Sequence, residues 1–229
     1  MNTIKIALSF LFLLIISSFL HSQTLISVDG GLNLASYITP KNIDAGTFKS
    51  FPSYGFGIDI KGREPKPMHI GFSIEYYLNS INWKSEESGG LGGSTRWYDI
   101  NYTIECLRFS LFPEFLIGKK YQFFCNLSPF FSLMIHSSKN GTSWTYNQSE
   151  RIETGSASDD ITKFDFGIKE GMGFGYAVKS FLVLSIEENG SLGIWNINKA
   201  SAGDVNSAGL SIFFCLSFII PKSKTEEQK

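Results

Sequence analysis

The sequence predicts an all-β protein, namely an eight-stranded antiparallel up-and-down transmembrane β-barrel, and three observations support that fold. Apolar and polar residues alternate with a period of two in one segment after another, and no long segment has the apolar period of a helix. The connections between these segments run alternately long and short, which is typical of a barrel with long outer loops and tight periplasmic turns. Charged residues are only 18 % of the chain, which contains 21 Phe and 22 Gly, a composition that favours extended chain with many turns.

The first 22 residues predict a cleaved secretory signal. Lys5 is the only charged side chain before an uncharged apolar run at 6–20, and Ser22 is the small residue before the expected cut. The run has 15 residues, fewer than the roughly 20 that a spanning helix needs, although an N-terminal membrane anchor is the alternative. We therefore assign 23–220 to an outer-membrane barrel and 221–229 to a polar periplasmic tail, which we expect to be disordered rather than docked to a partner.

The first half of the mature chain contains four expected strands. Ile26 to Leu34 sets Ile, Val and Leu against Ser, Asp, Gly and Asn, and Tyr54 to Lys61 sets Tyr, Phe and Ile against Gly, Asp and Lys. Met68 to Asn79 places Met, Ile, Phe and Tyr on one face and His, Gly, Ser and Glu on the other. The fourth strand covers about 97–116.

The second half contains four more expected strands and completes an even count. They cover about 121–136, 161–176, 180–190 and 210–218. The long connections are rich in Gly, Ser, Asn and Thr and lie at about 38–51, 84–96, 137–160 and 191–206. The short connections lie at about 62–67, 118–120 and 177–179. An even number of strands predicts that both mature termini lie on the periplasmic side.

Two positions break the alternation. In the fourth strand the apolar positions are even through Ile104 and odd from Leu107, so we expect a β-bulge at Cys106 or Leu107. In the sixth strand Glu170 falls on the apolar face. A carboxylate that faces lipid is costly, so either a second bulge turns Glu170 inward or this residue lies near a rim.

The direction of the alternation favours a membrane barrel over a soluble, lipocalin-like lipid carrier, which is the alternative. The apolar faces are long and almost uninterrupted, whereas charges occur in mid-strand on the opposite faces. Aromatic residues near the strand ends predict girdles at the membrane interfaces: Tyr37, Tyr54, Trp83, Trp97, Tyr98, Tyr121, Tyr176 and Trp195.

The polar faces predict a charged lumen. An eight-stranded barrel has an interior just wide enough for side chains to fill it, and unpaired buried ions are costly, so we expect a salt-bridged plug. The inward charges are Asp29, Asp59, Lys61, Glu75, Glu105, Arg108, Glu114, Asp165, Lys169 and Glu187. Room for these long side chains would come from Gly55, Gly57, Gly71, Gly171 and Gly173. The alternative is a narrow proton or ion channel along the same charges.

The sequence predicts no enzyme, no cofactor and no metal site. Cys106, Cys125 and Cys215 match no zinc or redox spacing and are interpreted as small buried hydrophobic residues. A net charge of −1 argues against nucleic acid as a partner. The GGLGG segment at 89–93 lacks the strand–loop–helix context of a phosphate loop. A lipid-modifying enzyme at the rim is the alternative, centred on His136 with Ser137, Ser138 and a carboxylate from Asp159 or Asp160.

Several stretches of the chain resemble the PorT-like outer-membrane β-barrel proteins of the Bacteroidetes, which are related in architecture to small barrels such as OmpX. The matching stretches are SVDGGLNLASY at 27–37, LRFSLFPEF at 107–115, GKKYQFFCNLSPFF at 118–131, KFDFGIKEGMGFGY at 163–176 and NGSLGIWNI at 189–197. The resemblance implies an eight-stranded, porin-like barrel in the outer membrane. The family's namesake is implicated in protein secretion and gliding.

Function is expected in the outer loops, because binding residues concentrate on loops that a rigid scaffold holds. The longest loop contains a possible binding surface formed by Trp144, Tyr146 and Arg151. The sequence thus predicts a small outer-membrane protein with a plugged lumen, surrounded by outer-membrane lipid. It would act as a structural or binding protein, or as an accessory subunit that contacts an envelope protein partner.

Overall fold

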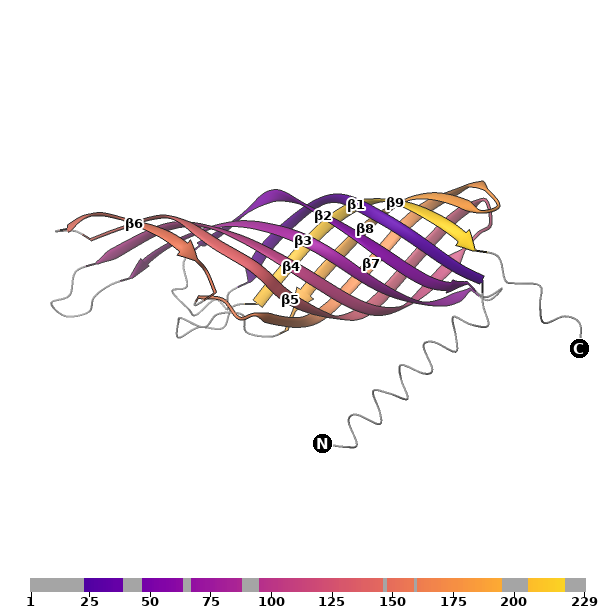
Figure 1. The fold of residues 1–229 in the computed structure, drawn as a ribbon, viewed down its shortest axis with the longest axis horizontal. Helices are drawn as coiled ribbons and strands as arrows, with labels where there is room; N and C mark the ends of the chain where they lie inside the picture. The colour runs from indigo at the N-terminus through magenta and orange to yellow at the C-terminus, as the bar shows by residue number, and fades with distance from the viewer. Residues whose placement is uncertain are drawn as a thin grey trace, which may run out of the picture.

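The computed structural model describes residues 23–38, 47–63, 67–87, 95–145, 148–158, 160–194 and 206–220. The predicted signal, the polar tail, the GGLGG segment and Trp195 lie outside the described residues. The strands are β1 (Gln23–Ile38), β2 (Thr47–Arg63), β3 (Met68–Glu87), β4 (Arg96–Ile117), β5 (Tyr121–Thr145), β6 (Gln148–Ser156), β7 (Phe164–Lys179), β8 (Leu182–Gly193) and β9 (Asn206–Ile220). Figure 1 shows them wound around one long axis. None of the described residues belongs to a helix that is long and apolar enough to cross a membrane.

Eight of these strands close into a ring. β1 pairs with β2 on one side and with β9 on the other, and the order continues through β3, β4, β5, β7 and β8. The pairing of β4 with β5 closes the ring, and all of these pairings are antiparallel. The predicted all-β up-and-down barrel is therefore confirmed. The ninth strand, β6, falls within the connection predicted at 137–160 and pairs only with β5 among the strands described.

The two faces of the barrel wall differ in chemistry, as the alternation predicted. Large apolar side chains point outward and are exposed, for example Leu32 (66 %), Phe56 (55 %) and Phe214 (69 %). The intervening positions are buried and polar, among them Ser27, Asp59 and Ser73. A soluble carrier needs the opposite arrangement, so this surface suits a lipid environment.

One tight turn depends on a glycine. Gly118 follows β4 with a φ of 99°, a left-handed conformation that side chains rarely adopt. A Cβ atom at this position would also lie 2.0 Å from the carbonyl oxygen of Tyr121. Gly118 therefore allows β4 to reverse into β5 over three residues, at the short connection predicted for 118–120.

Part of the sheet continues well beyond the ring. The pairing of β5 with β7 ends at Leu133 and Phe164, whereas the pairing of β4 with β5 continues to Arg96 and Thr145. We call this continuation the outer extension; it consists of 47–51 of β2, 78–87 of β3, 96–105 of β4, 136–145 of β5 and all of β6. Figure 1 shows it projecting at the end of the molecule opposite the start of β1 and the end of β9.

The bulge predicted in the fourth strand lies on its neighbour instead. Glu105 of β4 faces His136 of β5, and Cys106 faces Met134, so the extra residue is Ile135 of β5. The irregularity therefore lies at the predicted level, beside Cys106, but the inward positions of β4 remain even throughout, so the expected reversal of its later side chains is wrong.

The physical reason is that the interior changes chemistry along the axis. In the outer extension the even positions of β4, Ile100, Tyr102 and Ile104, are buried and pack against Ala157 and Ile161. In the barrel the apolar residues of β4 therefore lie on the outer face, whereas in the outer extension they lie on the inner face. The register of β4 with β3 does not change between the two regions.

Glu170 lies on the outer face without a bulge. β7 pairs with both neighbours in an unbroken register around this residue, which faces Leu127 of β5 and Gly190 of β8. It is exposed and lies midway between Phe164 and Tyr176, the two ends of the β5–β7 pairing. Both predicted explanations are wrong. The unbroken register excludes a second bulge at Glu170, and its place in the middle of the β5–β7 pairing excludes a rim position.

Candidate functional site

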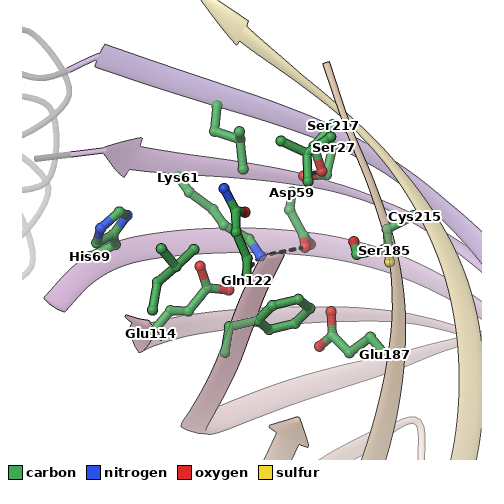
Figure 2. A pocket seen from close by; sticks show the side chains of 14 residues that line it. Ser27, Asp59, Lys61, His69, Glu114, Gln122, Ser185, Glu187, Cys215 and Ser217 are labelled. Carbon is green, nitrogen blue, oxygen red and sulfur yellow. Dashed lines mark hydrogen bonds and ion pairs between the residues drawn. The ribbon is translucent and has the colours of Figure 1, made fainter. Parts of the chain in front are cut away.

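The half of the lumen nearest the start of β1 and the end of β9 holds a network built around Lys61. The Nζ atom of Lys61 lies 2.6 Å from Oε2 of Glu114 and 3.7 Å from Oδ2 of Asp59, and all three residues are buried. Figure 2 shows Lys61 reaching from β2 between these carboxylates, with Glu187 beyond them. The ammonium group also lies over the rings of Phe112 (5.4 Å) and Phe124 (5.3 Å). Lys61 thus joins strands on different sides of the barrel.

A second ion pair crosses the lumen deeper in the barrel. Lys169 of β7 donates to Glu75 of β3, and both residues are almost fully buried. Asp29 and Glu187 are buried in the same interior with no ion pair among the described residues. The same interior therefore holds two ammonium groups, those of Lys61 and Lys169, and five buried carboxylates: Asp29, Asp59, Glu75, Glu114 and Glu187. The structure thus brings seven of the predicted inward charges into one interior, where carboxylates outnumber ammonium groups.

Above these charges, aromatic rings and one guanidinium fill the interior. Arg108 is held between the rings of Tyr77 (4.5 Å) and Phe130 (4.4 Å), and the ring of Tyr77 stacks on Phe213 at 5.7 Å. Tyr77, Phe130 and Phe213 are each at most 2 % exposed. Sequence reasoning missed these rings. Tyr77 and Phe213 occupy the alternate positions that carry polar residues in the rest of their strands, and this placement is the signal that could have identified them.

The lumen glycines make room chiefly for rings. A Cβ atom on Gly71 would lie 2.5 Å from the ring of Phe112, and one on Gly55 would lie 2.9 Å from the ring of Phe213. Gly173 likewise faces Phe124. The expectation that these glycines accommodate charged side chains holds for Gly57, which faces Asp29, and for Gly171, which faces polar side chains including that of Glu187.

Two small cavities lie on either side of the ring layer. The cavity nearer the start of β1 measures about 30 Å³ and is lined by Lys61, His69 and Glu187 among others (Figure 2). The outer one measures about 50 Å³ and is lined by Cys106, Arg108 and Asp165 among others. Ligand pockets usually measure about 300–1,000 Å³, so each cavity suits a few water molecules rather than a substrate.

The remaining predicted charges occupy the outer half of the barrel. Asp165 accepts a hydrogen bond from Ser207 at the rim of the outer cavity. Glu105 does not join the lumen network; it lies on the outer face, opposite His136 and Leu78, because its neighbours Ile104 and Cys106 both point inward. Its inclusion among the inward charges is therefore wrong.

The proposed His136 catalytic set is not assembled. His136 is exposed on the outer face of the bulge, whereas Ser137 is buried on the inner face. Asp160 also lies on the inner side, where its Oδ2 atom is 2.8 Å from Nζ of Lys139. Ser138 shares the outer face with His136, and the residue opposite His136 on β4 is Glu105, which is not part of the predicted set. Asp159 lies outside the described residues.

The expected loop surface divides between two faces of the outer extension. Trp144 is 40 % exposed on the outer face and stacks on Trp97 at 6.4 Å. Arg151 faces the other side with its neighbour Glu153, whose Oε1 atom lies 3.7 Å from Nε of Arg151. Tyr146 lies outside the described residues. Sequence reasoning missed Ile152, which is 72 % exposed on the face of Trp144.

One titratable group of the outer extension is tied to its neighbours. Asp99 of β4 accepts hydrogen bonds from Lys84 (2.6 Å) and Asn82 (2.7 Å), both on β3. These bonds favour the ionised carboxylate and lower the pKa of Asp99 below its ordinary value of 3.8. β3 and β4 are thereby joined by a charged side-chain contact as well as by backbone hydrogen bonds.

The three cysteines are free thiols; Cys215 is buried, and Cys106 and Cys125 are partly buried. Across the described ranges, no group of three or more His, Cys, Asp or Glu side chains is arranged to hold a metal ion.

Comparison with known proteins identifies a family. A family model described as "Outer membrane protein beta-barrel domain" matches residues 21–197. Among solved structures, OprG of Pseudomonas aeruginosa is similar at 11 % identity, over 86 % of this chain and 96 % of that one, with a TM-score of 0.48. Ail of Yersinia pestis, solved with a heparin analogue, is similar at 10 % identity, over 86 % and 99 % of the two chains, with a TM-score of 0.42. A search of curated proteins finds no match.

Proposed function

The chain belongs to the outer membrane protein beta-barrel domain family, and on that premise we propose that it is an outer-membrane binding protein with a closed barrel. Its activity resides in the outer extension, which contacts a protein of the cell envelope or cell surface. The barrel anchors this extension in outer-membrane lipid. Residues 1–22 act as a cleaved signal, and both mature termini lie in the periplasm.

The observation that carries this proposal is a contrast between the lumen and the outer extension. Arg108 and the rings of Tyr77, Phe130 and Phe213 occupy the interior between two cavities of only about 30 and 50 Å³. Four strands meanwhile continue beyond the ring, which costs backbone entropy and serves no purpose in closing a barrel. Their surface presents Trp144 and Ile152 to solvent, and aromatic side chains are enriched at protein interfaces.

Site-specific photo-crosslinking in cells tests this proposal. A photoreactive phenylalanine analogue at Trp144 should form a discrete protein adduct, whereas the same analogue at Phe131, on the outer face of the barrel wall, should label lipid. The absence of a protein adduct from Trp144, Arg151 and Thr154 alike would contradict a binding role for the outer extension. Heat-modifiable gel mobility of each variant checks that the barrel is folded.

A further inference from the structure

The outer extension ends in a sheet edge. In the part of the chain that the structure describes, β6 pairs with β5 and has no other strand neighbour. Residues 150–156 are exposed apart from Glu153, and this stretch contains no proline to block pairing. Natural proteins usually protect such an edge, because its backbone groups are free to pair with another strand.

Resting on the proposed function, we propose that the partner of this edge is a second copy of the chain, whose β6 pairs antiparallel with this one about Ile152. The charges of β6 select this register. In a symmetric antiparallel pair, residues that lie opposite each other point to the same face of the sheet. The twofold axis must therefore pass through a residue position, so each possible register is centred on one residue. With Ile152 at the centre, Arg151 of each copy faces Glu153 of the other.

Neighbouring registers bring like charges together. A pair centred on Arg151 places two guanidinium groups opposite each other, and a pair centred on Glu153 places two carboxylates opposite each other. Like charges directly opposite on a sheet are destabilising, and opposite charges are stabilising. The sequence QSERIETGS is thus self-complementary about Ile152.

The centre of the pair also covers an exposed apolar group. Ile152 is 72 % exposed, and in this register the two Ile152 side chains lie opposite each other on the outer face. On the inner face, the Arg151 side chain is 79 % exposed and its contact with Glu153 of the same chain is long, at 3.7 Å. Such a surface ion pair is weak, so Arg151 is available to a second carboxylate.

The symmetry determines which membrane holds the second copy. The twofold axis of an antiparallel strand pair is perpendicular to the sheet, and Figure 1 shows β6 running roughly along the axis of the barrel. The two barrels therefore point in opposite directions. Two such copies cannot lie in one membrane with the same orientation, so the contact joins two opposing outer membranes, as in adhesion between cells.

Nanodiscs that each carry one copy of the full chain test this inference. The wild type should form pairs of discs, measured by light scattering after size exclusion. In a background in which Cys106, Cys125 and Cys215 are replaced by alanine, Ile152→Cys should form a disulfide between discs. Thr154→Cys is the matched control, because in this register the two copies of residue 154 are roughly 13 Å apart. Crosslinking at 154 in place of 152 would overturn the register.

Charge reversal provides the second arm. Arg151→Glu alone and Glu153→Arg alone should each lose disc pairing, whereas a mixture of the two variants should pair again, because each reversed charge then meets its opposite. Glu86→Arg, on the exposed part of β3, should leave pairing unchanged. Absence of pairing in the wild type, or pairing that ignores both reversals, would overturn self-association. A protein adduct at Trp144 in cells would still support the proposed function, so the two failures are distinguishable.

Discussion

Lys169 of β7 and Glu75 of β3 form an ion pair across the lumen, although 94 residues separate them in sequence. The two strands are not neighbours in the ring, since β4 and β5 lie between them. The pair therefore ties opposite walls of the barrel together, with its charges hidden from water. Removing one member leaves a buried charge without its partner, which is more costly than removing both.

The first prediction concerns this pair. Lys169→Met should destabilise the barrel by about 3–5 kcal/mol, because it leaves Glu75 buried among other carboxylates. The double variant Lys169→Met with Glu75→Met should recover much of that loss. Urea unfolding in detergent micelles, followed by tryptophan fluorescence, gives the coupling energy. Additive effects of the two substitutions would show that the ion pair does not join the walls.

The second prediction concerns ring packing in the lumen. Gly71→Val should destabilise the barrel by about 1–3 kcal/mol, because even its Cβ atom would lie 2.5 Å from the ring of Phe112. Phe112→Leu in the same chain should restore part of the loss by freeing space. Thermal loss of the compact, unboiled gel band measures both variants. Equal destabilisation of the single and double variants would disprove a steric origin.

The strand pattern was readable in the sequence because the membrane imposes one chemistry on each face. Asp59, Lys61 and Glu75 lie where alternation placed them, since a mid-strand charge has only the lumen to enter. Alternation could not locate β6, because the residues of this strand are largely polar on both faces. It also could not place Tyr77 and Phe213 in the lumen, because their side chains are as apolar as those that face lipid. Alternation also misplaced Glu105. In the outer extension the interior is apolar, so the apolar residues of β4 occupy the inner positions there, and the sequence pattern resembles that of a bulge.

The third prediction concerns the lipid-facing carboxylate. Glu170 lies midway along the β5–β7 pairing on the outer face, where a cationic side chain costs about 2–4 kcal/mol and a carboxylate costs less. Glu170→Leu should therefore stabilise the barrel in lipid by about 1 kcal/mol, measured by urea unfolding in bilayers. Glu86→Leu in the outer extension should have no effect. A loss of stability in Glu170→Leu would indicate that this carboxylate has a partner.

The fourth prediction concerns pH. Because the pKa of Asp99 is lowered by Lys84 and Asn82, its contribution to the outer extension is complete above the ordinary pKa of 3.8 and is lost as the pH falls through the lower, folded value. Amide exchange at 96–103 of β4 should therefore accelerate at low pH, after correction for intrinsic rates. In Asp99→Asn this extra acceleration should be absent. Identical pH profiles for the two proteins would contradict a role for the Lys84–Asp99 pair.

The most direct test of a closed barrel that acts through its outer extension is single-channel recording in a planar lipid bilayer. The protein is inserted from micelles, and its heat-modifiable mobility confirms that it is folded. The wild type should show no discrete conductance, because Arg108, Tyr77, Phe130 and Phe213 fill the interior between the two small cavities. Reproducible current steps from the folded wild type would contradict a closed lumen and would assign the excess lumen carboxylates to an ion path.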